Sequence, residues 1–200
     1  MALARFQNLR RAVLAVIISL TLLLLLVVRS SADGEFHEYV EAAGLALIAI
    51  GIVGRMWCTL YIGGRKSSEI ISKGPYSISR NPLYVFSAIA AAGVGAQTGS
   101  LVIAVAVMVG CAGLFQVVIW REEQFLSMKF GQPYEAYTLA VPRFWPALSK
   151  FSDAPTLTVS TRLVYRTLAD GLIFFAAAPV LELVEELQKS GVLPVLFRLP

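Results

Sequence analysis

Charged side chains are scarce in this sequence. Asp, Glu, Lys and Arg make up only 15% of the 200 residues and 57% are apolar, whereas an ordinary soluble domain carries about 25% charged residues. This shortage argues against a soluble enzyme or binding module. The apolar residues fall in runs long enough to cross the hydrocarbon core as helices, which satisfy their own backbone hydrogen bonds. We therefore predict an all-α integral membrane protein with about five transmembrane helices, in one domain spanning residues 1–200.

Residues that commonly bind metals are also few. The two cysteines, Cys58 and Cys111, lie inside apolar runs without metal-site spacing, and the one histidine, His37, lies in a short acidic stretch. We interpret the cysteines as small buried side chains and His37 as a solvated loop residue, and we predict no metal site. The net charge of +4 does not indicate nucleic acid as a partner, because the basic residues flank the apolar runs and so report membrane topology.

The apolar runs cover 12–28, 40–62, 83–96, 101–120 and about 163–180. The first run follows three arginines and resembles a signal peptide, but its length and the lack of a small-residue cleavage site favour an uncleaved helix. Only four residues separate the third run from the fourth, which predicts a tight antiparallel helical hairpin. The last run contains Asp170 and precedes further acids, so it either crosses the membrane or lies at the interface against a partner.

The second run contains small residues and one charge. Gly44, Gly51 and Gly54 fall on roughly one face of a helix, which allows another helix to approach closely. Arg55 lies within the same run. A charge at this depth is expected either to anchor the helix at the interface or to pair inside the bundle.

The distribution of lysine and arginine predicts the orientation. The N-terminus, the 63–80 segment and the 121–162 segment are basic, whereas the 29–39 and 97–100 loops are not. Short basic loops stay in the cytoplasm, so we expect both long polar segments on the cytoplasmic side of a bacterial inner membrane or its equivalent. The core would cover residues 40–150, and the C-terminal helical extension, 151–200, would suit partner contact, including a homo-oligomer.

The first polar segment ends in a helix start. Gly74-Pro75 indicates a turn, Pro82 occupies a favoured first-turn position, and Asn81 is then a natural N-cap. Free N–H groups beside Arg80 would suit an anionic ligand group. Taken alone, this segment is better explained as an ordinary junction between a loop and a helix.

The second polar segment opens with two adjacent carboxylates, Glu122 and Glu123, at the end of a membrane helix. They could hold a cationic or amine-bearing ligand, or they could be solvated interface charges. Four aromatic residues follow that could form an interfacial belt, an interpretation strongest for the last of them: Tyr134, Tyr137, Phe144 and Trp145.

Taken together, the motifs of the two polar segments are more specific than any one of them alone. Gly-Pro-Tyr, Arg-Asn-Pro-x-Tyr, Glu-Glu, Phe-Gly-x-x-Tyr-x-x-Tyr and Val-Pro-Arg follow one another around the hairpin. This ordered set resembles the isoprenylcysteine carboxyl methyltransferase family, which is related to the phospholipid N-methyltransferases, over about residues 45–146. The resemblance implies S-adenosylmethionine as the methyl donor, bound on the cytoplasmic side, and a lipidic or amphiphilic acceptor within the membrane.

The resemblance also implies site residues. Those expected at the cofactor are Glu69, Ile70, Ile71, Tyr76, Arg80, Asn81, Pro82, Tyr84 and Glu122. Those expected to serve catalysis are Glu122, Glu123 and Arg143. One departure stands out, because Asn81 occupies the place of the usual histidine and cannot titrate near neutral pH. Any acid–base work of that histidine would be absent, whereas a positioning role could be kept.

Two other functions remain open. Membrane sterol reductases, which use NADPH, share a similar hairpin and an Arg-His-Pro-x-Tyr element, but they are much longer and this chain lacks an added basic cluster for a 2′-phosphate. A non-catalytic scaffold is the second alternative, with the acidic 181–189 helix and the tail serving partner contact. The sequence does not identify the methyl acceptor.

Overall fold

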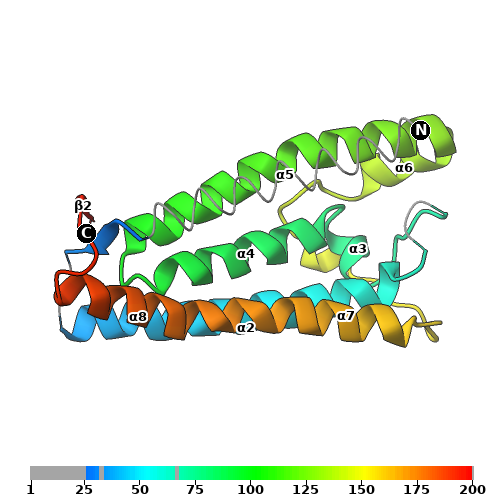
Figure 1. Ribbon diagram of the computed structural model, residues 1–200. Coiled ribbons are helices and arrows are strands. Elements are labelled where there is room, and N and C mark those ends of the chain that lie inside the picture. Colours follow the sequence, from blue (N-terminus) through cyan, green and yellow to red (C-terminus); the bar gives the residue numbers. More distant parts are fainter. Residues whose placement is uncertain (1–25, 32–33, 66–67, 200) are drawn as a thin grey trace, which may run out of the picture.

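Long helices lying side by side form the protein (Figure 1). The computed structural model describes residues 26–31, 34–65 and 68–199. Within them, three helical segments are long and apolar enough to cross a membrane: Glu35–Ile62, Leu101–Phe130 and Thr161–Lys189. The predicted all-α membrane fold is therefore confirmed. Most of the first apolar run, 12–28, lies outside the described residues, so the uncleaved first helix stays a prediction.

Helix α2 (Glu35–Ile62) begins earlier than its apolar run at residue 40. The prediction that His37 is a solvated loop residue is therefore wrong. His37 lies in the first turns of α2 and contacts Glu41, four residues further on, with Nε2 3.3 Å from the carboxylate. Such i,i+4 pairs stabilise a helix, so polar residues extend α2 beyond the part that hydropathy marks.

Helix α4 (Pro82–Ala96) packs antiparallel against α2 through small residues. A Cβ atom on Gly51 would lie 2.6 Å from the Ala90 Cβ, and one on Gly93 would lie 2.6 Å from the Gly44 carbonyl oxygen. The predicted glycine face is confirmed, because any larger side chain would force the helices apart. Arg55 pairs inside the bundle, where its guanidinium donates to the Ser87 hydroxyl of α4.

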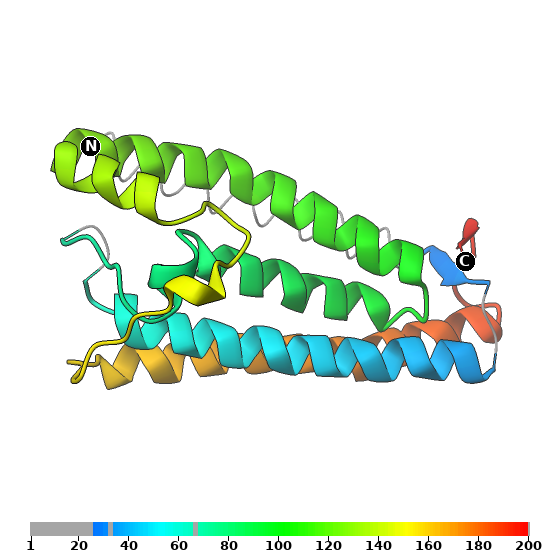
Figure 2. The same ribbon diagram turned by 180° about the vertical axis from the view of Figure 1, so that it is seen from behind.

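Helix α5 (Leu101–Phe130) completes the predicted hairpin with α4. Its N-cap, Ser100, accepts a hydrogen bond from the backbone N–H of Ile103. The helix does not end with its apolar run near residue 120 but continues to Phe130. With 30 residues against 15 in α4, it is about 20 Å longer, and Figure 2 shows it extending past the start of α4.

The C-terminal segment runs along α2 as α7 (Thr161–Leu172), the 3-10 turn η2 (Ile173–Ala176) and α8 (Ala177–Lys189). Its 29 residues are long and apolar enough to cross a membrane, although the last apolar run alone suggested only residues 163–180. The acidic 181–189 segment is the end of α8. Beyond it, β2 (Phe197–Leu199) pairs in parallel with β1 (Val28–Ser30).

The two ends of the bundle differ in composition (Figure 1). One end holds α3 (Pro75–Ile78), α6 (Gln132–Ala140) and the short η1 turn (Leu148–Lys150), so the two polar segments meet there, as predicted. The other end holds the two strands, the start of α2 and the end of α8. The first is called the cleft end below and the second the strand end.

Candidate functional site

A cleft lies between the first turn of α4 and the last turns of α5. Its cavity volume is about 90 Å³, below the roughly 300–1,000 Å³ of typical ligand pockets, so a ligand of ordinary size would extend out through its open mouth. Because α4 begins well short of the end of α5, the start of α4 forms the floor and α5 forms a wall. The lining residues are Ile62, Glu69, Ile70, Ile71, Tyr76, Arg80, Asn81, Leu83, Tyr84, Glu122, Glu123, Phe125, Leu126, Tyr134 and Tyr137.

Asn81 occupies the N-cap position of α4, and Pro82 takes the first helical position, as predicted. The expected side-chain cap is absent, however. The Asn81 amide instead donates to a Glu123 carboxylate oxygen at 3.4 Å and to the Arg143 carbonyl oxygen at 3.3 Å. The prediction that the Asn81 side chain caps α4 is therefore wrong: a cap would use its amide oxygen as an acceptor, whereas the bonds that the side chain makes use its amide nitrogen as a donor.

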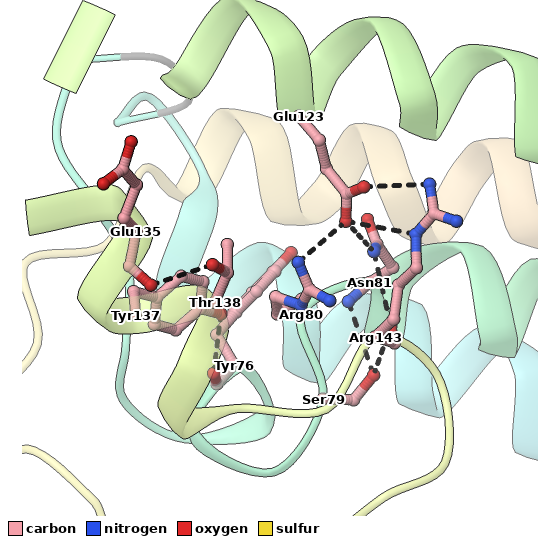
Figure 3. A network of polar contacts seen from close by, with 9 residues as sticks. All are labelled: Tyr76, Ser79, Arg80, Asn81, Glu123, Glu135, Tyr137, Thr138 and Arg143. Atoms are coloured by element: carbon pink, nitrogen blue, oxygen red, sulfur yellow. Dashed lines mark hydrogen bonds and ion pairs between the residues drawn. The ribbon is translucent and has the colours of Figure 1, made fainter. Parts of the chain in front are cut away.

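Glu123 is the centre of a charge cluster (Figure 3). Arg143 contacts both of its oxygens, with Nη2 2.8 Å from one and Nε 3.3 Å from the other, and Arg80 Nη1 lies 3.3 Å from the latter. The Glu123 side chain is only 18% exposed. Four N–H donors therefore surround this carboxylate, so Glu123 occupies the anion position that was expected for a ligand beside Arg80.

Backbone hydrogen bonds hold the two polar segments together around this cluster. The Arg80 N–H donates to the Pro142 carbonyl at 2.9 Å, and the Ala147 N–H donates to the Ile78 carbonyl at 2.9 Å. The Ser79 hydroxyl also donates to the Arg143 carbonyl at 3.4 Å. The Val-Pro-Arg element thus reaches the helix start from a distant part of the sequence.

Glu122 is held differently from its neighbour. Its carboxylate accepts a hydrogen bond from the Tyr84 hydroxyl at 2.9 Å. The ring of Tyr84 packs against Phe115 with centroids 5.0 Å apart, so α4 and α5 together fix this pair. Glu122 and Tyr84 both line the cleft, which places a carboxylate and an aromatic ring at its surface.

Tyrosines form much of the remaining wall. The Tyr76 side chain is 5% exposed, and its hydroxyl has no hydrogen-bond partner among the described residues. Tyr137 donates its hydroxyl to the Tyr76 carbonyl at 2.8 Å. Burial raises the pKa of both phenols above the ordinary value, so both stay neutral hydrogen-bond donors. An unsatisfied buried hydroxyl is unfavourable.

The structure brings together most residues predicted for the site. Of the predicted cofactor residues, all except Pro82 line the cleft, and Glu69 does so at its exposed rim, paired with Arg65. Pro82 is buried in the first turn of α4. Arg143 does not line the cleft but holds Glu123, which does.

Sequence reasoning missed part of the wall. The lining residues absent from the predicted site are Ile62, Leu83, Phe125, Leu126, Tyr134 and Tyr137. Phe125 and Leu126 follow Glu122 by three and four positions, a helical spacing that could have indicated them. The tyrosine motif was noted as part of the family resemblance and as a possible interfacial belt, but its two tyrosines were not named among the site residues. The belt interpretation suits Trp145, which is 88% exposed, and not the buried Tyr134.

Comparison with known proteins identifies relatives over nearly the whole chain. The profile of the phospholipid methyltransferase family matches residues 40–133. The nickel-cobalt-cadmium resistance protein NccN of Alcaligenes xylosoxydans xylosoxydans is 35% identical over 189 residues, covering 92% of this chain and 87% of NccN. The cobalt-zinc-cadmium resistance protein CzcN of Cupriavidus metallidurans is 33% identical over 185 residues, covering 92% of this chain and 85% of CzcN. No solved structure matches significantly.

Proposed function

Since the chain belongs to the phospholipid methyltransferase family of integral membrane proteins, we propose that it transfers a methyl group from S-adenosylmethionine to a lipidic or amphiphilic acceptor. The cleft between α4 and α5 is the proposed active site. The basic segments at the cleft end favour a cytoplasmic orientation, because short basic loops remain in the cytoplasm. The water-soluble donor would then enter from that side.

The chemistry of the cleft suits such a donor. A sulfonium cation is attracted to aromatic faces and carboxylates, and Tyr84, Tyr134 and Glu122 line the cleft. The Tyr76 hydroxyl, which has no hydrogen-bond partner among the described residues, would offer a donor to a polar ligand. The observation that carries the proposal is this combination of a neutral donor, aromatic rings and carboxylates within a single cleft.

Glu122 and Glu123 would have different roles in the proposed site. Glu123 is surrounded by Arg80, Arg143 and the Asn81 amide, so it positions chain segments and is poorly placed to take a proton. Glu122 accepts a hydrogen bond from the Tyr84 hydroxyl and lines the cleft. We therefore assign to Glu122 the contact with the donor's positive charge and, for an amine acceptor, removal of the proton.

When bound, S-adenosylmethionine supplies an electrophilic methyl group. The acceptor's lone pair forms the new bond to carbon, the carbon–sulfur bond breaks, and its electron pair stays on sulfur. Such a displacement depends mainly on orientation, which the rigid α2–α4 floor would provide. A carboxylate or thiolate acceptor needs no base, whereas an amine gives its proton to Glu122.

The apolar part of the cleft supports an amphiphilic acceptor. Leu83, Phe125 and Leu126 line it, and Phe125 is 44% exposed on the side of α5. A chain entering from the bilayer would meet these side chains before it reached Glu122. Asn81, which bonds Glu123 and Arg143, fits the positioning role left open for the family histidine.

The direct test is binding of S-adenosylmethionine to detergent-purified protein, followed by methyl transfer into a total lipid extract. Glu122→Gln and Tyr84→Phe should weaken both donor binding and methyl transfer. Glu135→Gln, which changes an exposed glutamate on α6, is the matched control. No binding at millimolar donor would overturn the proposal. Binding of NADPH without binding of S-adenosylmethionine would favour a reductase. Binding of neither compound would favour a non-catalytic scaffold.

The names of NccN and CzcN refer to metal resistance. We extend this setting to the present chain and propose that its methyl transfer serves growth in the presence of nickel, cobalt or cadmium. A deletion strain should grow poorly on these ions, and the wild-type gene should restore growth. If the Glu122→Gln gene restored growth equally well, methyl transfer would not be the relevant activity.

A further inference from the structure

The strand end carries a second group of polar side chains, away from the cleft. His37 and Glu41 lie one turn apart near the start of α2, and Glu185 lies on α8 (Figure 1). His37 Nε2 is 3.3 Å from a Glu41 oxygen and 3.6 Å from a Glu185 oxygen. One ligand atom from each of the three residues lies within 4.8 Å of the others.

We propose that His37, Glu41 and Glu185 bind a divalent first-row transition metal ion such as Co²⁺, Ni²⁺ or Zn²⁺. Imidazole suits these ions, and carboxylate oxygens complete many of their sites. The proposal is independent of the methyl-transfer function. The length of α2, 28 residues or about 40 Å, separates the two sites, so this ion takes no part in chemistry at the cleft.

The spacing of the ligand atoms matches such an ion. Nitrogen and oxygen ligands lie about 2.1 Å from Zn²⁺, so two of them at a tetrahedral angle are about 3.4 Å apart. The two distances from the imidazole nitrogen, 3.3 and 3.6 Å, bracket this value. Three protein ligands would leave at least one position for water, as in open metal sites.

The surroundings hold the ligands in place. The imidazole lies so close to Gly99 that a Cβ atom there would be 2.0 Å from Nδ1, which restricts the ring. Lys189 binds Glu185 Oε1 at 2.8 Å, whereas Oε2 is the oxygen nearest His37. The three side chains are 15%, 35% and 25% exposed, so they are shielded yet reachable from solvent.

Further carboxylates lie on the same two helices as the group. Glu35 and Glu38 lie on the first turn of α2, and Glu182 and Glu186 lie on α8. All four are exposed. Such an excess of negative charge raises the local concentration of cations, which favours a metal ion over a simple ion pair among His37 and its neighbours.

The test is a Co²⁺ titration of the tag-free, full-length protein in detergent, followed by calorimetry and by the visible absorption of the bound ion. We expect one ion per chain with nitrogen and oxygen ligation. His37→Gln and Glu185→Gln should each weaken binding about tenfold or more. Glu135→Gln, at an exposed position on α6 at the cleft end, is the matched control, and circular dichroism checks that each variant is folded.

Three results would overturn the proposal: no saturable Co²⁺ binding at micromolar concentrations, equal affinity in the wild type and in both variants, or the intense near-ultraviolet band of thiolate ligation. The last result would point to Cys58 or Cys111 instead. Because the assay uses the metal alone, absence of Co²⁺ binding would not contradict the methyl-transfer proposal. Absence of methyl transfer would likewise not contradict the proposed metal site.

Discussion

Both ends of the bundle bring acidic and basic side chains together, but the balance of charge differs. At the cleft end, Glu123 contacts two arginines and an asparagine amide. At the strand end, Glu41 and Glu185 share His37, with Lys189 on one oxygen. At the cleft end, the two arginines outnumber the Glu123 carboxylate, and its negative charge holds chain segments together. Where carboxylates are in excess, the group is suited to receive a cation.

This difference also separates two neighbours in the sequence. Glu122 and Glu123 are adjacent on α5, yet one bonds a tyrosine at the cleft and the other lies between guanidinium groups. Adjacent residues on a helix point about 100° apart, so each meets different neighbours. A pair that looks like one acidic motif therefore performs two tasks.

The largest effect should follow Glu123→Gln. It leaves Arg80 and Arg143 without their shared carboxylate, and we expect a loss of about 2 kcal/mol of stability, below the value for a fully buried pair because the site is partly exposed. Glu185→Gln at the strand end should cost less than about 1 kcal/mol. Thermal unfolding in detergent without added metal measures both, and equal losses would remove the contrast between the two ends.

Next in size is Glu122→Gln. Removing the charge at the cleft should lower kcat/KM for methyl transfer about tenfold or more, with the unfolding temperature unchanged. Labelled donor and a lipid extract provide the assay. A parallel loss of stability and activity would show that Glu122 is structural like Glu123.

A smaller effect is expected from Tyr76→Phe. The variant removes a buried hydroxyl that has no partner among the described residues, so stability should stay the same or rise slightly. Donor affinity should fall about three- to tenfold if the ligand satisfies this group. Tyr165→Phe, at an exposed position on α7, is the control. Unchanged donor affinity would exclude the hydroxyl from the site.

A last prediction concerns alkaline pH. Burial raises the pKa of Tyr76 and Tyr137 in the folded protein, whereas unfolded tyrosines ionise near pH 10. Their contribution to stability is complete below that pH and is lost as the pH rises above it. Unfolding in denaturant at about pH 9 and 11 should show the decline, and it should be shallower in the Tyr76→Phe/Tyr137→Phe double variant. Equal slopes would contradict this.

Much of the architecture could be predicted because lipid imposes simple rules on sequence. Apolar run length indicated the helices, and Gly51 and Gly44 indicated the close approach of α4. The ends of helices were predicted less well. Polar residues extend α2 to Glu35 and α5 to Phe130, and hydropathy does not register helical turns outside the bilayer.

The site was predicted as a set of residues, not as an arrangement. Motif order indicated that 73–84 and 120–146 belong together, and the cleft contains most of the named positions. Nothing in the order indicated that Asn81 would bond Glu123 and leave α4 uncapped. Partners of this kind depend on three-dimensional distances between segments far apart in the sequence.

The sequence by itself determined the membrane-embedded helical fold, the hairpin and the family, because hydrophobic length, short links and ordered motifs are local properties. Only the tertiary structure decided which glutamate lies between guanidinium groups, which buried tyrosine hydroxyl lacks a partner among the described residues, and that His37 meets Glu185. Those outcomes depend on how α4, α5 and α8 pack. Packing sets the distances over which charges attract, and neighbours in space need not be neighbours in the chain.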